Sequence, residues 1–441
     1  MPLVTLQLGQ CGNQIGGQLF STIIEDADCK HTGVTKKEND NYLEAVNERF
    51  FVEDKHGKLE ARAVMVDMET KAISKTRLDA KKSGKWHYPD KQQFCQKKGS
   101  GNNWAHGFCA HGPKAHDDIM ALVQSEVEKC DHFDGFLTLM SLAGGTGSGV
   151  GAYITQCLRD EYPHSFIMNQ VVWPYNTGEV IVQNYNALLT LSQLYLYSDA
   201  LLIMENDKIQ KICSQLLNIK HISFQDMNTV IAHKLASFLQ PTVRTEGSHT
   251  RQNRLGDMLE HLVAHPDYKL LSLLNIPQMS EAALQYSAYQ WPGLLKHLRQ
   301  MLIANAPMEE GIDWNVRVSS GAIRNHNFSL ANLLLLRGKD CNMADVSAFT
   351  EPKLYTDWIP SGCGLLEWKQ PRMFCQYEKS ASLLSNSQTP VTPLNSVLEK
   401  SWSMFGARAF VHQYIKFGLA EEDFLDSFAS LEQVLKNYKD L

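Results

Sequence analysis

The sequence predicts an α/β protein with three parts: a domain built on a parallel sheet, a smaller α+β domain and a C-terminal helical region. Three observations support this prediction. Through the first half of the chain, short apolar runs alternate with segments of helical periodicity. One of these runs ends in a glycine-rich turn that leads into a helix. The final segment is periodic at helical spacing. We expect the three parts to cover residues 1–243, 244–380 and 381–441.

Composition and charge exclude several classes of protein. The chain has 441 residues, 44% of them hydrophobic and 20% charged, which is ordinary for a globular protein and excludes a disordered or fibrous one. A net charge of −6 gives no basic face, so we expect no nucleic-acid binding. No apolar run reaches the ~18–20 residues that span a bilayer, so no membrane insertion is expected. The ten cysteines are scattered, without a CxxC pair, which indicates a reduced cytoplasmic protein.

The apolar runs of the first half define the expected sheet. The predicted strands are Leu3–Leu8, Arg62–Met68, Gly135–Leu142, Phe166–Trp173 and Asp199–Met204. Predicted helices follow most of them: one through Ile15, Leu19 and Ile23, then Asp117–Glu128, Gly151–Asp160, Gln183–Tyr195 and Lys208–Leu217. Strands that are apolar on both faces and alternate with helices are typical of a parallel sheet with right-handed crossovers. The polar segment Gly33–Lys58 is interpreted as a surface excursion.

The second half is predicted to be mixed. A long amphipathic helix, Phe224–Leu239, should end before Pro241, and the polar stretch Thr242–Asn253 should separate the halves. Beyond it, the expected elements are the strands Tyr268–Ile276, Ser329–Arg337 and Ser382–Asn386 and the helix Trp291–Asn305. The chain should end in the helices Ser396–Phe405, Ala407–Tyr414 and Glu421–Tyr438.

The sharpest motif is the run Ala143-Gly144-Gly145-Thr146-Gly147-Ser148-Gly149, between a predicted strand and a predicted helix. Glycines allow the backbone to approach a ligand closely, and the free N–H groups at a helix start favour an anion. Thr146 and Ser148 add hydroxyl donors. The run is not a Walker A loop, and its spacing is tighter than GxGxxG. We therefore predict that its backbone binds phosphate; the alternative is a glycine-rich turn without a ligand.

Other strand ends supply groups that would complement a phosphate loop. Gln10 and Cys11 begin the first helix, where their donors could meet a second phosphate edge. Asp67 and Glu69 lie two residues apart at a strand end, a spacing that suits Mg²⁺ ligands or, alternatively, two solvated carboxylates. The loop Gly99–Trp104 could close over a phosphate or form a simple turn.

A base and a sugar also have candidate partners. Phe224 and Asn228 lie four residues apart on a predicted helix, so they share a face and could stack and read a purine. The alternative buries Phe224 in the core and leaves Asn228 solvated. Asn206 follows an apolar strand, where a ligand-facing polar residue belongs in an α/β sheet. Glu179 could accept a ribose hydroxyl or lie in water.

These motifs resemble the signature of the tubulin superfamily. The segments that carry the resemblance are QLGQCGNQIG at Gln7–Gly16, GSGNNWA at Gly99–Ala105, AGGTGSG at Ala143–Gly149, VDME at Val66–Glu69, NYN at Asn184–Asn186, LRG at Leu336–Gly338 and the terminal segment Phe410–Tyr438. They cover almost the whole chain in the family's order. Departures from the alpha and beta subunits, such as WPYNTGEVIVQNYN and EEDFLDSF, are similar to the delta branch. The resemblance implies a Rossmann-like tubulin/FtsZ nucleotide domain, an intermediate domain and C-terminal helices.

The resemblance also implies a guanine-nucleotide site. The phosphates of GTP or GDP would lie on Gln10, Cys11, Asn102 and the loop Ala143–Gly149, with Asp67 and Glu69 toward Mg²⁺. The ribose would meet Glu179, Gln183 and Asn206, while guanine would stack on Phe224 and pair with Asn228. Gln183 and Phe224 stand where alpha and beta subunits have glutamate and tyrosine, so the geometry is kept and the polar contacts are weaker.

Hydrolysis of GTP is expected only on assembly. In polymers of this family, a loop of one subunit presents a polar or acidic residue to the γ-phosphate held by its neighbour. By resemblance this catalytic residue is Asp257, acting in trans. The alternative is that Asp257 and Glu260 form a capping box before Leu262.

The expected function is that of a GTP-binding cytoskeletal protein. Resemblance to the delta branch implies a role in the triplet microtubules of centrioles and basal bodies, and through them in cilia. It places the protein in the cytoplasm, cytoskeleton, centrosome and ciliary base, and allows a nuclear pool. Its partners would be other tubulins, in head-to-tail contact, or centriolar proteins. The alternative is a nucleotide-switched regulator or adaptor that never enters a microtubule lattice.

Overall fold

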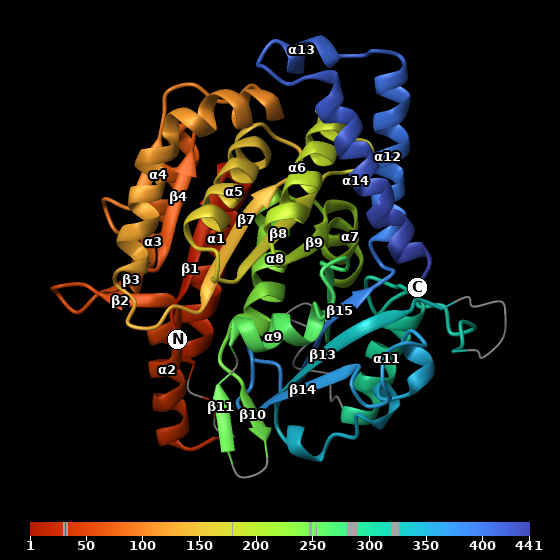
Figure 1. The fold of residues 1–441 in the computed structure, drawn as a ribbon. Coiled ribbons are helices and arrows are strands. Elements are labelled where there is room, and N and C mark those ends of the chain that lie inside the picture. The colour runs from red at the N-terminus through yellow and green to blue at the C-terminus, as the bar shows by residue number, and fades with distance from the viewer. Residues whose placement is uncertain are drawn as a thin grey trace.

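The computed structural model describes residues 1–29, 31, 34–178, 180–246, 249–252, 254–279, 290–318 and 326–441. Within this part of the chain, one twelve-stranded sheet has the order β11-β10-β14-β13-β15-β12-β9-β8-β7-β1-β4-β6 (Figure 1). Its strands are β1 (Leu3–Leu8), β4 (Ala63–Asp67), β6 (Gln93–Cys95), β7 (Gly135–Ser141), β8 (Ile167–Trp173), β9 (Ala200–Glu205), β10 (Val243–Glu246), β11 (His249–Gln252), β12 (Leu270–Ile276), β13 (Ser329–Gly338), β14 (Leu365–Gln370) and β15 (Lys379–Ser387). A three-stranded sheet contains β2 (Phe51–Glu53), β3 (Leu59–Ala61) and β5 (Trp86–His87).

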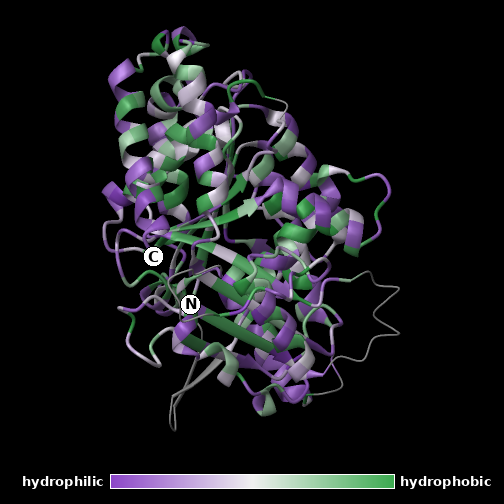
Figure 2. Ribbon diagram, turned by 90° about the vertical axis from the view of Figure 1, so that its right-hand side faces the viewer, coloured by the Kyte–Doolittle hydropathy of each residue, from purple (hydrophilic) through white to green (hydrophobic). Residues whose placement is uncertain are grey.

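Helices cover both faces of the large sheet. They are α1 (Gly9–Asp28), α2 (Lys36–Phe50), α3 (Thr70–Ser83), α4 (Gly112–Val127), α5 (Gly151–Glu161), α6 (Gln183–Tyr197), α7 (Asn206–Lys211), α8 (Phe224–Leu239), α9 (Leu255–Leu262), α11 (Trp291–Ile303), α12 (Val391–Gly406), α13 (Val411–Ile415) and α14 (Glu421–Lys439). The C-terminal helices α12 and α14 pack on α6 (Figure 1). In Figure 2 the central strands are mostly hydrophobic, whereas the helices mix hydrophilic and hydrophobic residues. Among the described residues, no helix is both long and apolar enough to cross a membrane.

The predicted α/β class is confirmed. Strands β4, β1, β7, β8 and β9 pair in parallel, as apolar runs separated by helices require. The predicted limits of these five strands differ from those observed by at most one residue. The sheet then continues into the second half, because β12 pairs with β9 in parallel and with β15 antiparallel. The division at residues 243 and 380 stays a prediction.

The interpretation of Gly33–Lys58 as a surface excursion is wrong. Most of that segment folds as α2 and β2. Thr35 and Glu38 form a capping box that begins the helix, and Tyr42, Val46 and Phe50 are buried at helical spacing. The many charged residues of the segment lie on the other face, so the narrow apolar stripe was not recognised in the sequence.

Several further elements were not predicted. Helices α3 and α9 and strand β14 are short or polar, and part of the polar stretch Thr242–Asn253 forms the hairpin β10–β11. Helix α12 begins at Val391, before the predicted Ser396. Short elements gain most of their stability from tertiary packing, so local periodicity gives a weak signal for them.

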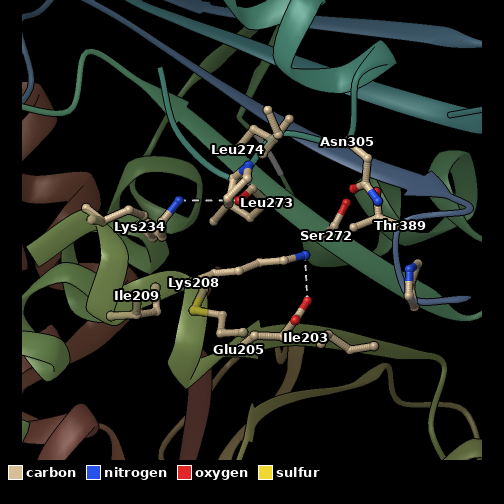
Figure 3. A pocket seen from close by; sticks show the side chains of 15 residues that line it. Ile203, Glu205, Lys208, Ile209, Lys234, Ser272, Leu273, Leu274, Asn305 and Thr389 are labelled. Atoms are coloured by element: carbon tan, nitrogen blue, oxygen red, sulfur yellow. Dashed lines mark hydrogen bonds and ion pairs between the residues drawn. The ribbon is translucent and has the colours of Figure 1, made fainter. Parts of the chain in front are cut away.

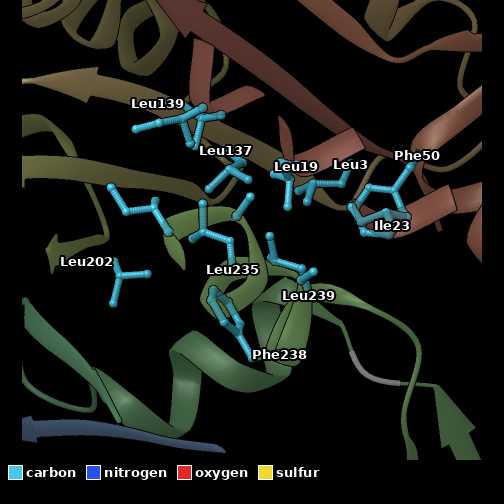
Figure 4. Close-up of a cluster of buried hydrophobic side chains, with 14 of the residues drawn as sticks. Leu3, Leu19, Ile23, Phe50, Leu137, Leu139, Leu202, Leu235, Phe238 and Leu239 are labelled. Carbon is cyan, nitrogen blue, oxygen red and sulfur yellow. The ribbon is translucent and has the colours of Figure 1, made fainter. Parts of the chain in front are cut away.

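Helix α8 runs through the centre of the core. Ser223 and Asp226 form a capping box at its start, and Ile231, Leu235 and Phe238 are buried in a cluster with residues of α1, β1 and β7 (Figure 4). At its other end, the guanidinium of Arg337 on β13 donates to three backbone carbonyls, those of Ser237, Gln240 and Pro241, over 2.7–3.2 Å. These bonds satisfy carbonyls that the helix end leaves open.

The side chain of Lys234 on α8 is buried without a carboxylate beside it in the described structure. Its Nζ donates to Asn275 Oδ1 at 2.6 Å and to the carbonyl of Leu273 at 3.4 Å, next to a cavity of about 50 Å³ (Figure 3). Across this cavity, Lys208 pairs with Glu205 at 2.6 Å. Burial lowers the pKa of Lys234 to about 7, and the charge of Lys208 contributes in the same direction.

This burial predicts a pH-dependent stability. Between pH about 7 and 10.5 the unfolded chain binds a proton at Lys234 and the folded protein does not, so the free energy of unfolding should rise with pH across this window. Lys234→Met should remove roughly 4 kcal/mol of that rise. Denaturant unfolding of wild type, Lys234→Met and the exposed-site control Lys75→Met from pH 7 to 10.5 measures the difference. Identical pH profiles for wild type and Lys234→Met would contradict the prediction.

Candidate functional site

The candidate site lies at the carboxyl edge of the parallel strands. Gln10 and Cys11 follow β1, Asp67 ends β4, the run Ala143–Gly149 follows β7, and Asn206 follows β9. Because these strands pair in parallel, their carboxyl ends lie at one edge of the sheet. The side chain of Asn13 joins two of the strand ends by donating to the carbonyls of Gly9 and Val66, at 2.9 and 3.1 Å.

The glycine run forms a compact turn. Thr146–Val150 is a π-helical turn that leads directly into α5. The hydroxyl of Ser148 is buried and donates to the carbonyl of Gly144, so it serves the loop itself and is not a free donor. Thr146 Oγ1 lies 3.3 Å from Ser100 Oγ, which connects this turn to the Gly99–Trp104 loop.

Most of these glycines are required by packing of the chain against itself. A β-carbon at Gly145 would lie 2.8 Å from the backbone nitrogen of Asn103, and one at Gly149 would lie 2.3 Å from the carbonyl of Trp104. Gly9, at φ +72°, would bring a β-carbon 2.8 Å from the nitrogen of Gly147. At Gly144 the space is open, and its nearest neighbour is Asn102 Oδ1 at 3.9 Å. The face at Gly144 is therefore the one that a ligand can approach.

Asn186, which the sequence did not single out as a site residue, holds the two loops together. Its Nδ2 donates to the carbonyls of Asn102 and Ala143, both at 2.8 Å. Its Oδ1 accepts from the Trp104 N–H at 3.0 Å and from the Tyr414 hydroxyl at 2.7 Å. A fully buried amide with all of these bonds fixes the loop geometry. Its place in the NYN run was the signal available in the sequence.

Asp67 and Glu69 differ in their surroundings. Asp67 is 4% exposed, and its Oδ1 accepts from the Glu69 N–H at 3.3 Å, whereas the Glu69 side chain is exposed. Burial raises the pKa of Asp67 to about 6. No lysine or arginine of the described chain forms an ion pair with Asp67. A buried carboxylate without an ion-pair partner, at the same edge of the sheet as the glycine run, fits a divalent cation.

The alternative for Phe224 and Asn228 is excluded. Phe224, the first residue of α8, is 56% exposed, whereas Asn228 is 8% exposed, the reverse of a core phenylalanine with a solvated amide. Asn228 Nδ2 lies 3.5 Å from Gln14 Oε1. An exposed ring beside a buried amide forms a surface on which a flat base can stack while its edge is read.

The ribose candidates are only partly described. Asn206 is the first residue of α7 and is half-buried. Gln183 begins α6 and donates from Nε2 to the carbonyl of Tyr175 at 2.7 Å, so it also positions the preceding loop. Glu179 lies outside the described residues. Burial raises the pKa of Cys11 to about 12, so its thiol is uncharged at neutral pH.

Asp257 lies in the first turn of α9, at the opposite edge of the sheet. A β-carbon at Gly135, which begins β7, would lie 2.9 Å from Leu255 of α9. The glycine run follows the other end of β7, seven residues away, or roughly 20 Å. Within the described residues, the N-cap residue of α9, Arg254, makes no capping side-chain bond, and the Leu255 N–H donates to Asp134 Oδ2 at 3.0 Å. Asp257 is therefore separate from the glycine run of its own chain.

The open space at Gly144 predicts a selective effect on ligand binding. Gly144→Ala should lower the affinity for GTP at least about tenfold, because a methyl group would occupy the ligand side of the loop. It should leave the melting temperature unchanged. Gly145→Ala should instead lower the melting temperature, since its methyl group meets backbone.

Fluorescent-nucleotide titration and thermal unfolding measure both effects. Gly293→Ala is the control, since nothing lies within 4 Å of a β-carbon there. Wild-type affinity in folded Gly144→Ala would show that the phosphates bind elsewhere.

Comparison with known proteins agrees with this geometry. The Tubulin/FtsZ family GTPase-domain model matches residues 2–214. The chain is 54% identical to the tubulin delta chain of Mus musculus and of Macaca fascicularis, and 53% identical to that of Homo sapiens, in each case over 453 aligned positions and 100% of both chains. The resemblance to the tubulin family and its delta branch is confirmed. This chain belongs to the tubulin family.

Proposed function

We propose that this protein is a GTP-binding cytoskeletal tubulin of the delta type, which supports the triplet microtubules of centrioles and basal bodies and thereby cilia. GTP binding is supported by the open face at Gly144 and the buried Asp67 at the carboxyl edge of the parallel strands. It is also supported by Asn228 of α8, which lies 3.5 Å from Gln14 of α1, the helix that begins at that edge. The centriolar role is supported by the identity with tubulin delta chains over the full length.

In this proposal the phosphates bind to backbone N–H groups of the loop Ala143–Gly149, with Gln10, Cys11 and Asn102 around them. Because the thiol of Cys11 is uncharged, it would not repel the phosphates. Asp67 and Glu69 would hold Mg²⁺, which offsets the phosphate charge. That fit is supported by the raised pKa of Asp67, since a cation beside a buried carboxylate restores its charged form.

Base recognition rests on Phe224 and Asn228. The ring provides a plane for stacking, and the amide of Asn228 can accept from the N1–H and N2–H₂ of guanine. Adenine presents the opposite pattern on that edge, so binding it would leave a buried amide unpaired. Asn206, Gln183 and Glu179 would surround the ribose.

The direct test is to identify the bound nucleotide. We expect denatured, purified protein to release guanine nucleotide at about one per chain, and excess GTP, but not ATP, to displace it. Chromatography of the released material and competition with each nucleotide measure this. Equal competition by ATP, or the release of no nucleotide from a protein that also fails to bind added GTP, would refute the proposed site.

Assembly with other tubulins would complete the site. Asp257 and the glycine loop lie at opposite edges of one subunit, so a head-to-tail neighbour can bring its Asp257 to the γ-phosphate. Such a heterologous contact can repeat to form a filament. The proposed partners are therefore tubulin subunits or centriolar proteins with a complementary edge, and the proposed location is the centriole or basal body.

This arrangement predicts concentration-dependent hydrolysis. The dilute protein should show negligible GTPase activity, which should appear on self-association or with added tubulin heterodimer. Asp257→Ala should abolish this activity without changing the affinity for GTP, because the residue approaches the nucleotide only across an interface.

Phosphate release measured against protein concentration, with and without heterodimer, tests the prediction. Glu260→Ala, one turn further along α9 and exposed, is the matched control. A specific rate that is independent of concentration and lost in Asp257→Ala would place Asp257 in cis. Absence of any interaction with tubulin, with nucleotide binding intact, would favour the regulator that never enters a lattice.

A further inference from the structure

The small sheet β2–β3–β5 brings together three side chains that the nucleotide site does not use. Strand β2 pairs with β3 antiparallel, and β3 pairs with β5 in parallel, with Glu60 directly opposite His87. Residues directly opposite each other in register project from the same face of a sheet. The pairing of β3 with β5 therefore places the side chains of Glu60 and His87 next to each other.

The other face of this sheet is anchored in the core. Phe51 and Trp86 are buried there with Phe20 and Tyr88, and the ring centroids lie 5.0–6.2 Å apart. Packed aromatic rings fix the strands that carry them. Glu60 and His87 thus project outward from a rigid support.

Asp54 comes to the same place from the turn after β2. Its Oδ1 accepts from the backbone N–H groups of His56 and Lys58, at 2.7 and 2.8 Å, and its own N–H donates to the Lys58 carbonyl at 2.8 Å. These bonds hold the pKa of Asp54 below its usual range, and the nearby imidazoles of His56 and His87 contribute. Its second oxygen, Oδ2, is left to face His87 Nε2 at 3.8 Å.

We propose that Asp54, Glu60 and His87 form a zinc site. Their donor atoms all lie within 4.8 Å of one another, and His87 Nε2 is 3.2 Å from Glu60 Oε1. Zinc bonds of ~2.0–2.1 Å in a tetrahedral arrangement place donors ~3.4 Å apart, so small side-chain rotations complete the site. One imidazole and two carboxylates favour zinc over Mg²⁺ or Ca²⁺, which prefer oxygen alone.

The arrangement leaves a fourth position open. The three side chains are 17–25% exposed, so a water molecule can reach an ion held between them. No lysine or arginine in the described part of the chain pairs with either carboxylate. A bound ion would join the β2–β3 turn to β5, and so stabilise the folded protein.

The competing explanation is that a protonated His87 bridges the two carboxylates without a metal. Both explanations give His87 a part in the stability of the folded protein, so stability alone does not separate them. Only the zinc site predicts a stoichiometric ion whose affinity depends on all three residues.

Competition with a chromophoric chelator on the full chain, freed of metal beforehand, tests the proposal with Zn²⁺ alone. We expect one zinc ion per chain at this site, with His87→Ala and Glu60→Gln each weakening it at least about tenfold. The control His265→Ala removes a histidine that pairs with a single carboxylate, Asp267, at 4.0 Å, and it should not change zinc affinity. Zinc should raise the melting temperature of wild type and of His265→Ala, but not of His87→Ala.

Three results would overturn the proposal. One is the absence of stoichiometric zinc binding. Another is zinc binding that folded Glu60→Gln and His87→Ala retain at wild-type affinity, since the ion would then lie elsewhere. The third is displacement of zinc by an equal concentration of Mg²⁺ or Ca²⁺, because a site that includes imidazole should not allow it.

Discussion

The position of helix α8 is the constraint on which most of the structure depends. Its first two turns carry Phe224 and Asn228, its middle carries the apolar stripe that fills the core, and its end is held by Arg337 of β13. One rigid helix therefore links the candidate base site to the sheet of the second half. A buried guanidinium that lost these carbonyl partners would carry an uncompensated charge, so the linkage is costly to break.

The candidate phosphate site depends on the packing of two loops against each other. Two loops from separate strand ends meet because glycines remove the β-carbons that would collide and because Asn186 bonds to both backbones. Most of the glycines serve this loop-to-loop packing, and the open face at Gly144 is what remains for a ligand. The hydroxyl of Ser148 likewise supports the turn from within.

Parallel strands give the subunit its polarity. The carboxyl edge carries the glycine loop, whereas the amino edge lies against α9 and Asp257. The sheet continues through β12, which is parallel to β9 on one side and antiparallel to β15 on the other. The carboxyl and amino edges therefore belong to one continuous sheet. If the carboxyl edge of one subunit contacted the amino edge of another, the strands of the two subunits would run in the same direction.

The sequence by itself determined the fold class, the main strands, helix α8 and the glycine-rich turn after β7, because each follows from local periodicity or from a run of glycines. The sequence did not predict helix α2, because its apolar stripe is narrow and most of its residues are polar or charged. Only the tertiary structure decided that Phe224 is exposed and Asn228 buried, that Asn186 joins two loops, and that Asp134 rather than Asp257 bonds the first turn of α9. It also brought Asp54 and Glu60 to His87. These depend on contacts between residues far apart in the chain, and a local pattern carries no information about which distant group will satisfy a given polar atom.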